Sequence, residues 1–346
     1  MAKSKGKTFP KLHNAAWPGT VGKGVAGAEP FIDFDTMLRL TADAEVNGVK
    51  FDGIDIALGK SHFDLDNIDD EIKRTAEKVA KSNLAIGTIV PAIWSGSAFG
   101  DDAARKIFLD EVKKGCQVGA AFRKLGIRPS GCIRIDTASG VELWAKDPEA
   151  NQKRIVETFT EACHIAADFD EVLACEGEIC RGGIHSWRRL LQILETVDRP
   201  QTLGFQADMS HTLLYMLGYN APEDRILPPD FDWNDTAAFD AGYKKLTDAL
   251  RIWTVDLHIA QNDGSVFGNG THDKTGRHCL PKDPNGKLDI VKYAGFWLRD
   301  QDGLTKRFNH ICWDGCMFPN KVMHDPQTWN DILEAMNNVR NEHGWK

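Results

Sequence analysis

Four apolar runs of strand length end in side chains that could bind a divalent metal ion. The polar groups are Glu176 and Glu178 after residues 172–175, Asp208 and His211 after 203–207, His258 at the end of 253–258, and Asp314 after 310–313. Two or three carboxylates with one neutral imidazole form an oxygen-rich site that suits Mn²⁺, Mg²⁺, Co²⁺ or Zn²⁺, and it is too hard for a thiolate zinc site. We therefore predict one divalent ion as cofactor, with Mn²⁺ as the first candidate.

A divalent ion beside carboxylates can support proton transfer next to a carbonyl group. The ion would chelate a carbonyl oxygen and a neighbouring hydroxyl, and it would stabilise the charge that develops when the proton between them is removed. Return of the proton on the opposite face gives epimerisation, return to the adjacent carbon gives isomerisation, and loss of a group β to the carbonyl gives elimination. These reactions share their first step, so residue types alone do not separate them.

The segments between these runs have the apolar spacing of helices. Two of the helices are preceded by Asp147-Pro148 and Asp325-Pro326, each a capping residue followed by a first-turn proline. The predicted helices include residues 72–80, 155–166, 187–194 and 329–339. Further strand-length runs lie at 13–17, 53–58, 84–90 and 131–135. Strand and helix therefore alternate along the chain.

About eight strand-and-helix units predict a (β/α)8 barrel, the TIM barrel of the α/β class. In such a barrel the strand ends meet at one mouth, which would bring the polar groups together. A doubly wound open sheet is the alternative, but no GxGxxG follows the first strand. No linker-like change of composition divides the chain, so we predict a single domain over residues 1–346.

Two connections are longer than the usual length of about two to six residues. Residues 221–240 and 261–286 are predicted to follow strands 6 and 7, which places both at the mouth of the barrel. We expect them to fold over a bound ligand and shield it from water. Insertions without a functional role are the alternative.

The strand-end motifs resemble those of sugar isomerases and epimerases with the xylose-isomerase-like barrel, which include ketose 3-epimerases and relatives acting on 3-keto-glycosides. Asp208-Met209-Ser210-His211 is similar to the family's Asp-x-x-His, residues 258–264 to its His-followed-by-Asp loop, and Trp313-Asp314 to its last-strand Trp-Glu. The resemblance covers residues 15–329. It implies Glu176, Asp208, His258 and Asp314 as metal ligands and His211 as a substrate contact.

Two positions depart from the family's pattern. Asp314 stands where the family usually has Glu, so its carboxylate reaches less far. Asp314 could therefore bind the metal without also serving as a base. Glu178 stands where relatives often have His. Because Glu176 and Glu178 are two residues apart on an extended segment, they share a face, and one can hold metal while the other faces the substrate. We predict Glu178 as the general acid or base, and we count Glu176 and Asp314 among the catalytic residues. The alternative for Glu178 is a structural role, as a carboxylate at the barrel rim that forms a salt bridge with Arg181.

Residues after other strands are candidate substrate contacts, because aromatic faces often stack on sugar rings and polar groups can bind hydroxyls. The candidates are His62, Trp94, Arg134, Asp136 and His272, with His278 on the same long connection as His272. The aromatic residues could instead plug the barrel rim. No glycine-rich phosphate cradle follows strands 7 and 8, which disfavours a phosphorylated substrate.

The composition of the 346-residue chain excludes several classes of protein. With 42 basic and 50 acidic residues, its net charge of −8 has the wrong sign for a nucleic-acid-binding protein. No apolar stretch approaches the ~18 residues of a membrane span, and no signal-peptide core follows the basic start. The eight cysteines lack paired CxxC spacing, which indicates reduced thiols and a cytoplasmic location. The sequence is compatible with a homo-oligomer.

The leading hypothesis is a metal-dependent isomerase or epimerase that acts on a neutral sugar or keto-glycoside. A lyase that eliminates the aglycone from a 3-keto-glycoside is the nearest alternative. Endonucleases that cut DNA at abasic sites use the same barrel, but they need several zinc ions and a basic face, and the acidic balance disfavours them. A sugar-binding barrel without catalysis is the remaining alternative.

Overall fold

The computed structural model describes residues 9–266, 277–299 and 308–346. Eight parallel strands close into a barrel in the order β1-β10-β7-β6-β5-β4-β3-β2. They are β1 (Lys11–Ala15), β2 (Gly53–Ala57), β3 (Ala85–Val90), β4 (Ile133–Ile135), β5 (Leu173–Glu176), β6 (Leu203–Asp208), β7 (Thr254–Ile259) and β10 (His310–Trp313). The predicted (β/α)8 barrel is confirmed.

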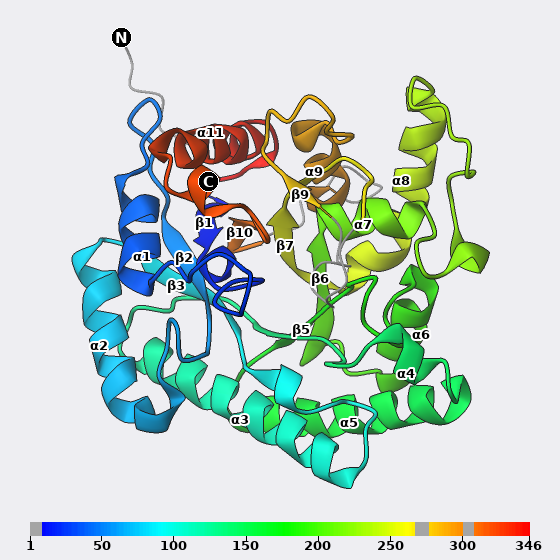
Figure 1. Cartoon of the computed structure of the whole chain (residues 1–346), viewed down its shortest axis with the longest axis horizontal. Helices are drawn as coiled ribbons and strands as arrows, with labels where there is room; N and C mark the ends of the chain where they lie inside the picture. The colour runs from blue at the N-terminus through cyan, green and yellow to red at the C-terminus, as the bar shows by residue number, and fades with distance from the viewer. Residues whose placement is uncertain (1–8, 267–276, 300–307) are drawn as a thin grey trace.

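Helices surround the barrel on its outside (Figure 1). The long ones are α1 (Phe34–Asp43), α2 (Ile68–Lys81), α3 (Asp102–Lys124), α5 (Pro148–Asp168), α6 (Trp187–Val197), α8 (Thr236–Leu250), α9 (Ile290–Leu298) and α11 (Pro326–His343). Shorter helices are α4 (Val141–Trp144), α7 (Met209–Met216) and α10 (Asn320–Met323). Within the described residues, no helix is both long enough and apolar enough to cross a membrane.

The helix starts that the sequence indicates are present. The Asp147 side chain accepts a hydrogen bond from the backbone N–H of Ala150 at the start of α5, and Asp325 caps α11 in the same way. The first strand differs, because it covers Lys11–Ala15 rather than residues 13–17. Trp17 lies instead in a 3-10 turn (Trp17–Gly19), since Pro18 has no N–H with which to continue a strand.

The two long connections differ in structure. Residues 221–240 do not follow β6 directly, because α7 comes between them. In the second connection, β8 (Gln261–Asn262) pairs antiparallel with β9 (His278–Cys279). This pairing returns the chain to the mouth of the barrel at residue 278.

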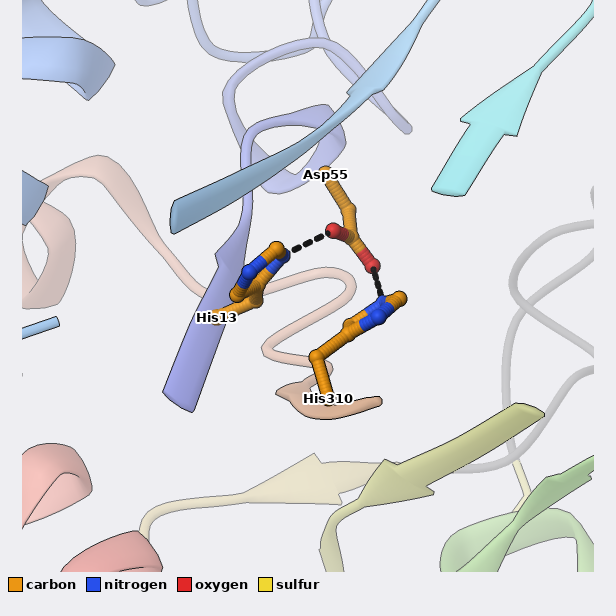
Figure 2. A group of neighbouring side chains, drawn as sticks. All are labelled: His13, Asp55 and His310. Atoms are coloured by element: carbon orange, nitrogen blue, oxygen red, sulfur yellow. Dashed lines mark hydrogen bonds and ion pairs between the residues drawn. The ribbon is translucent and has the colours of Figure 1, made fainter. Parts of the chain in front are cut away.

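Deeper in the barrel, titratable side chains replace the branched apolar residues that usually fill this interior. Asp55 of β2 accepts a hydrogen bond from His13 Nδ1 of β1 at 2.8 Å and one from His310 Nε2 of β10 at 3.2 Å (Figure 2). The two imidazole rings stack with their centroids 4.2 Å apart. We call His13, Asp55 and His310 the His–Asp–His cluster.

Glycine residues make room for this cluster. A Cβ at Gly87 would overlap Asp55 Oδ1 and His13 Nδ1. We therefore expect Gly87→Ala to lower the free energy of unfolding by about 1–3 kcal/mol, the usual cost of overpacking a core. Urea denaturation measures the change.

Gly140→Ala is the matched control for Gly87→Ala. A Cβ at Gly140 would have no neighbouring heavy atom within 4 Å, and its φ is −76°. We expect its free energy of unfolding to stay within about 0.5 kcal/mol of wild type. Equal losses in the two variants would show that residue 87 is not tightly packed.

Candidate active site and metal centre

Four buried side chains converge at the mouth of the barrel. Glu176 ends β5, Asp208 ends β6, His258 lies in β7, and Asp314 directly follows β10. One potential ligand atom from each lies within 4.8 Å of the other three. His258 Nδ1 is 3.8 Å from Glu176 Oε1, 3.7 Å from Asp208 Oδ2 and 3.9 Å from Asp314 Oδ2. The fold thus brings together the four residues predicted as ligands, which we call the ligand cluster.

Each carboxylate of the ligand cluster is anchored through one oxygen and has its other oxygen near His258 Nδ1. The anchoring donors are Arg134 for Glu176 Oε2, the backbone N–H groups of Ser210 and His211 for Asp208 Oδ1, and Trp17 Nε1 with the Cys316 N–H for Asp314 Oδ1. These donors fix the carboxylates so that three oxygens and one nitrogen face a common point. The shorter side chain of Asp314 still reaches this point.

The ligand cluster contains buried atoms that have no hydrogen-bond partner within the described residues. These atoms are Asp208 Oδ2 and both ring nitrogens of His258. Leaving such a group unsatisfied costs about 1–3 kcal/mol, and the separations in the cluster are too long for normal hydrogen bonds. A cation held between the oxygens and the imidazole nitrogen would satisfy Asp208 Oδ2 and His258 Nδ1. The residues therefore fit a divalent ion with oxygen and nitrogen ligands.

The electrostatics of the ligand cluster favour positive charge. Burial alone would lower the pKa of His258, but Asp208 and Asp256 together with the other carboxylates raise this pKa to about 10. Burial opposes the charge of His278 as well, and Asp314 and Asp208 raise the pKa of His278 to about 9. In the absence of an ion, the carboxylates therefore draw protons onto the neighbouring imidazoles.

Glu178 lies beside the ligand cluster and shares an arginine with it. Arg134 Nη2 donates to both Glu176 and Glu178. Cys180 Sγ donates to Glu178 Oε2 at 3.1 Å, and Arg181 Nε lies 3.8 Å from the same oxygen. Glu178 is buried against the barrel mouth and lines a cavity. Its position allows contact with a bound molecule.

This cavity has a volume of about 290 Å³ and adjoins the ligand cluster. One part of its wall is polar and includes Arg134, Glu176, Glu178, His211, His278 and Asp314. Another part is apolar and includes Trp17, Val21, Ala57, Leu58, Val90 and Trp94. The cavity can therefore hold a molecule with one polar end and one apolar end.

The sequence of residues 42–279 matches a protein family described as xylose isomerase-like TIM barrel. The chain belongs to this family. The match includes the β5, β6 and β7 positions of the ligand cluster and ends at Cys279, before Asp314. No curated protein matches the chain.

Solved structures share the fold of this xylose isomerase-like barrel at low sequence identity. A D-tagatose 3-epimerase-like protein is 13% identical, with a TM-score of 0.60 and coverage of 95% of this chain and 98% of that one. The 3-keto-D-glucoside 4-epimerase from E. coli is 13% identical, with a TM-score of 0.56 and coverage of 95% and 99%. The IOLI protein, solved with a zinc atom, is 12% identical, with a TM-score of 0.61 and coverage of 96% and 99%.

The xylose isomerase-like barrel places most of the predicted substrate contacts at the cavity. His62, Trp94, Arg134 and His211 line it. Asp136 is not among the lining residues; it accepts hydrogen bonds from Trp94 Nε1 at 2.9 Å and from Arg134 Nη1 at 2.6 Å. It therefore fixes two residues of the wall. His272 lies outside the described residues.

Some cavity residues have no recognisable signal in the sequence. Val21 lines the wall but follows no strand-end motif, and Cys316, which comes shortly after Trp313-Asp314, belongs to no sugar-binding or metal-binding pattern. The hydrogen bond from Trp17 to Asp314 joins residues that are 297 positions apart, and local sequence patterns do not reveal such a contact. His278, by contrast, is a contact that the sequence predicts on the second long connection, and it lines the cavity. Among the described lining residues none comes from 221–240, and closure of either connection over a ligand stays a prediction.

Proposed function

We propose that this chain is a divalent-metal-dependent sugar isomerase or epimerase that removes a proton next to a carbonyl group. The observation that carries the proposal is the ligand cluster, in which three carboxylates anchored through one oxygen each surround His258 Nδ1 beside a cavity. The substrate is a neutral sugar or a keto-glycoside. The names of two structural neighbours, a D-tagatose 3-epimerase-like protein and a 3-keto-D-glucoside 4-epimerase, support this class.

Glu176, Asp208, His258 and Asp314 would hold the ion, and Mn²⁺ is the first candidate. When bound, the ion would supply Lewis-acid stabilisation of the oxygen charge that develops during deprotonation. The zinc atom in the neighbouring IOLI structure supports a divalent ion in this kind of barrel.

The chain's own residues divide the remaining tasks. Glu178 moves the substrate proton, because it is the carboxylate that lines the cavity beside the ligand cluster. Arg134 holds Glu176 and Glu178 next to each other. His211 and His278 can donate hydrogen bonds to substrate hydroxyls from the polar wall. The apolar wall excludes water from the reacting carbon.

Elimination from a 3-keto-glycoside is the second candidate reaction. The apolar wall around Trp17, Val90 and Trp94 favours it, since these side chains offer an apolar aglycone a larger contact than a free sugar can use. Proton removal by Glu178 would be common to both reactions. The products distinguish them.

Incubation of the Mn²⁺-loaded protein with ketoses, aldoses and 3-keto-glycosides in deuterated water tests the function. We expect deuterium at the carbon next to the carbonyl, detected by NMR and mass spectrometry, together with an epimer or an aldose–ketose pair. An unsaturated product would identify the lyase instead. Binding of a sugar without deuterium incorporation would overturn the enzymatic proposal in favour of a sugar-binding barrel.

His278→Ala tests the contribution of the second long connection. The imidazole lines the cavity, and its Nε2 lies 3.7 Å from Asp208 Oδ2 and 4.0 Å from Asp314 Oδ2. We expect kcat/KM to fall by about 10–100-fold, as for loss of one hydrogen bond of about 1.5–3 kcal/mol to a charged group, with Mn²⁺ still bound. Steady-state kinetics and metal analysis measure both. Loss of Mn²⁺ would instead make His278 a metal ligand.

A further inference from the structure

The two ring nitrogens of His258 have different surroundings. Nδ1 faces the carboxylates of the ligand cluster, whereas Nε2 is buried and has no hydrogen bond within the described residues. Among the described carboxylates, Asp256 alone has an oxygen within 4.0 Å of Nε2, with Oδ2 at 3.9 Å. Asp256 and His258 are two residues apart on β7, so both side chains point into the barrel.

Asp256 is held firmly in this position. Its Oδ2 accepts hydrogen bonds from Thr88 Oγ1 of β3 at 2.8 Å and from Gln206 Nε2 of β6 at 2.7 Å. The carboxylate is thus fixed by the adjacent strand β6 and, across the barrel interior, by β3. The side chain is 2% exposed, so no solvent competes for its oxygens.

On the side away from His258, Asp256 lies next to the His–Asp–His cluster. His310 Nε2 lies 3.7 Å from Asp256 Oδ1 and 3.2 Å from Asp55 Oδ2, and Asp55 in turn bonds His13 (Figure 2). Burial opposes the charge of Asp55, but His310 and His13 outweigh burial and hold the pKa of Asp55 well below its ordinary value. An ordered series of imidazoles and carboxylates therefore runs from β1 and β2 to His258.

We propose that Asp256 is the positioning residue of His258 and that the His–Asp–His cluster keeps Asp256 in place. An imidazole that binds a metal through Nδ1 carries its proton on Nε2, and metal-bound histidines almost always donate this proton to a carboxylate, a carbonyl or water. Asp256 Oδ2 would accept it after a small movement. The inference rests on the proposed ion at His258.

The His–Asp–His cluster is better suited to this structural task than to binding an ion of its own. Both oxygens of Asp55 already accept hydrogen bonds from the imidazoles. An ion at this place would have to displace both hydrogen bonds. The ligand cluster, in contrast, has unpartnered atoms that face one another.

Titration of the metal-free full chain with MnCl₂ tests the role of Asp256. We expect Asp256→Asn to weaken Mn²⁺ binding by about 10–100-fold, as found when such carboxylate partners are lost. Asp256→Glu keeps the acceptor and should recover much of the affinity. Calorimetry gives the dissociation constant, and electron paramagnetic resonance of bound Mn²⁺ reports a changed ligand environment.

Glu171→Gln is the control for general damage to a buried ion pair. Glu171 is buried and pairs with Arg123 and Arg128, and in the described part of the chain no hydrogen bond or ion pair joins its carboxylate directly to Asp256 or His258. This variant should lose stability and keep the Mn²⁺ affinity of wild type. If Asp256→Asn fails to fold, His310→Gln replaces it, and we expect a measurable loss of Mn²⁺ affinity below the roughly 10–100-fold of a direct partner, because His310 reaches His258 only through Asp256.

Three outcomes would overturn the proposal. Equal Mn²⁺ affinity in wild type and Asp256→Asn would show that Asp256 only fills the core, while the proposed function would stand. Binding of two Mn²⁺ ions per chain, one of them lost in His310→Gln, would make the His–Asp–His cluster a second metal site. Failure of wild type to bind Mn²⁺ would overturn both the ion at His258 and the role of Asp256.

Discussion

Asp208→Asn should abolish tight Mn²⁺ binding and, with it, catalysis. Asp208 Oδ2 is buried without a hydrogen-bond partner and lies near His258 and His278, whereas Oδ1 caps α7. The amide keeps the size and removes the charge that a divalent ion needs, so we expect a loss of affinity greater than the roughly 100-fold found for outer partners of metal ligands. Calorimetric titration with MnCl₂ measures this loss.

Thermal unfolding gives a second measure of the same effect. An ion that binds only the folded chain stabilises it by about 2.7 kcal/mol at a concentration one hundred times Kd. Excess Mn²⁺ should therefore raise the Tm of wild type and leave the Tm of Asp208→Asn and of His258→Ala unchanged.

Asp240→Asn is a suitable control for Asp208→Asn. Asp240 lies on the outer helix α8, where its carboxylate contacts Lys292 and Tyr293. This variant should bind Mn²⁺ as wild type does. Undiminished binding by both Asp208→Asn and His258→Ala would mean that the ligand cluster is not the metal site.

Glu178→Gln should lower kcat by a factor of roughly 10² or more, while the protein keeps its bound metal. Gln keeps the shape of the side chain but cannot accept the substrate proton. Glu178 lines the cavity and is not one of the four residues of the ligand cluster. Arg134 donates hydrogen bonds to both Glu178 and Glu176. Turnover and deuterium exchange, measured beside metal analysis, test this separation of roles.

Glu176→Gln is the paired variant, and it should lose Mn²⁺ because Glu176 Oε1 faces His258 Nδ1 at 3.8 Å. If Glu178→Gln loses the metal and Glu176→Gln keeps it, the two roles must be exchanged. Full activity of Glu178→Gln would reduce Glu178 to an ion-paired carboxylate of Arg134 and Arg181.

The barrel and the four strand ends of the ligand cluster could be predicted from local patterns in the sequence. Helix starts at Asp147-Pro148 and Asp325-Pro326 and short apolar runs are local signals, so they do not depend on distant contacts. Once eight strand-and-helix units are recognised, closure of a parallel barrel places every strand end at one mouth. The sequence therefore predicts that Glu176 and His258 lie close together, although they are 82 positions apart in the chain.

Two features of the site depend on contacts between distant segments: which oxygen of each carboxylate faces His258 Nδ1, and which residues lie behind the ligand cluster. The anchoring of Asp314 by Trp17 joins the two ends of the chain, and its geometry depends on the register of β1 against β10. The contact of Asp256 with Thr88 likewise crosses the barrel interior. The His–Asp–His cluster needs residues of β1, β2 and β10 at one depth. Local patterns carry no information on such contacts, because strand register and side-chain packing are settled only when the whole barrel closes.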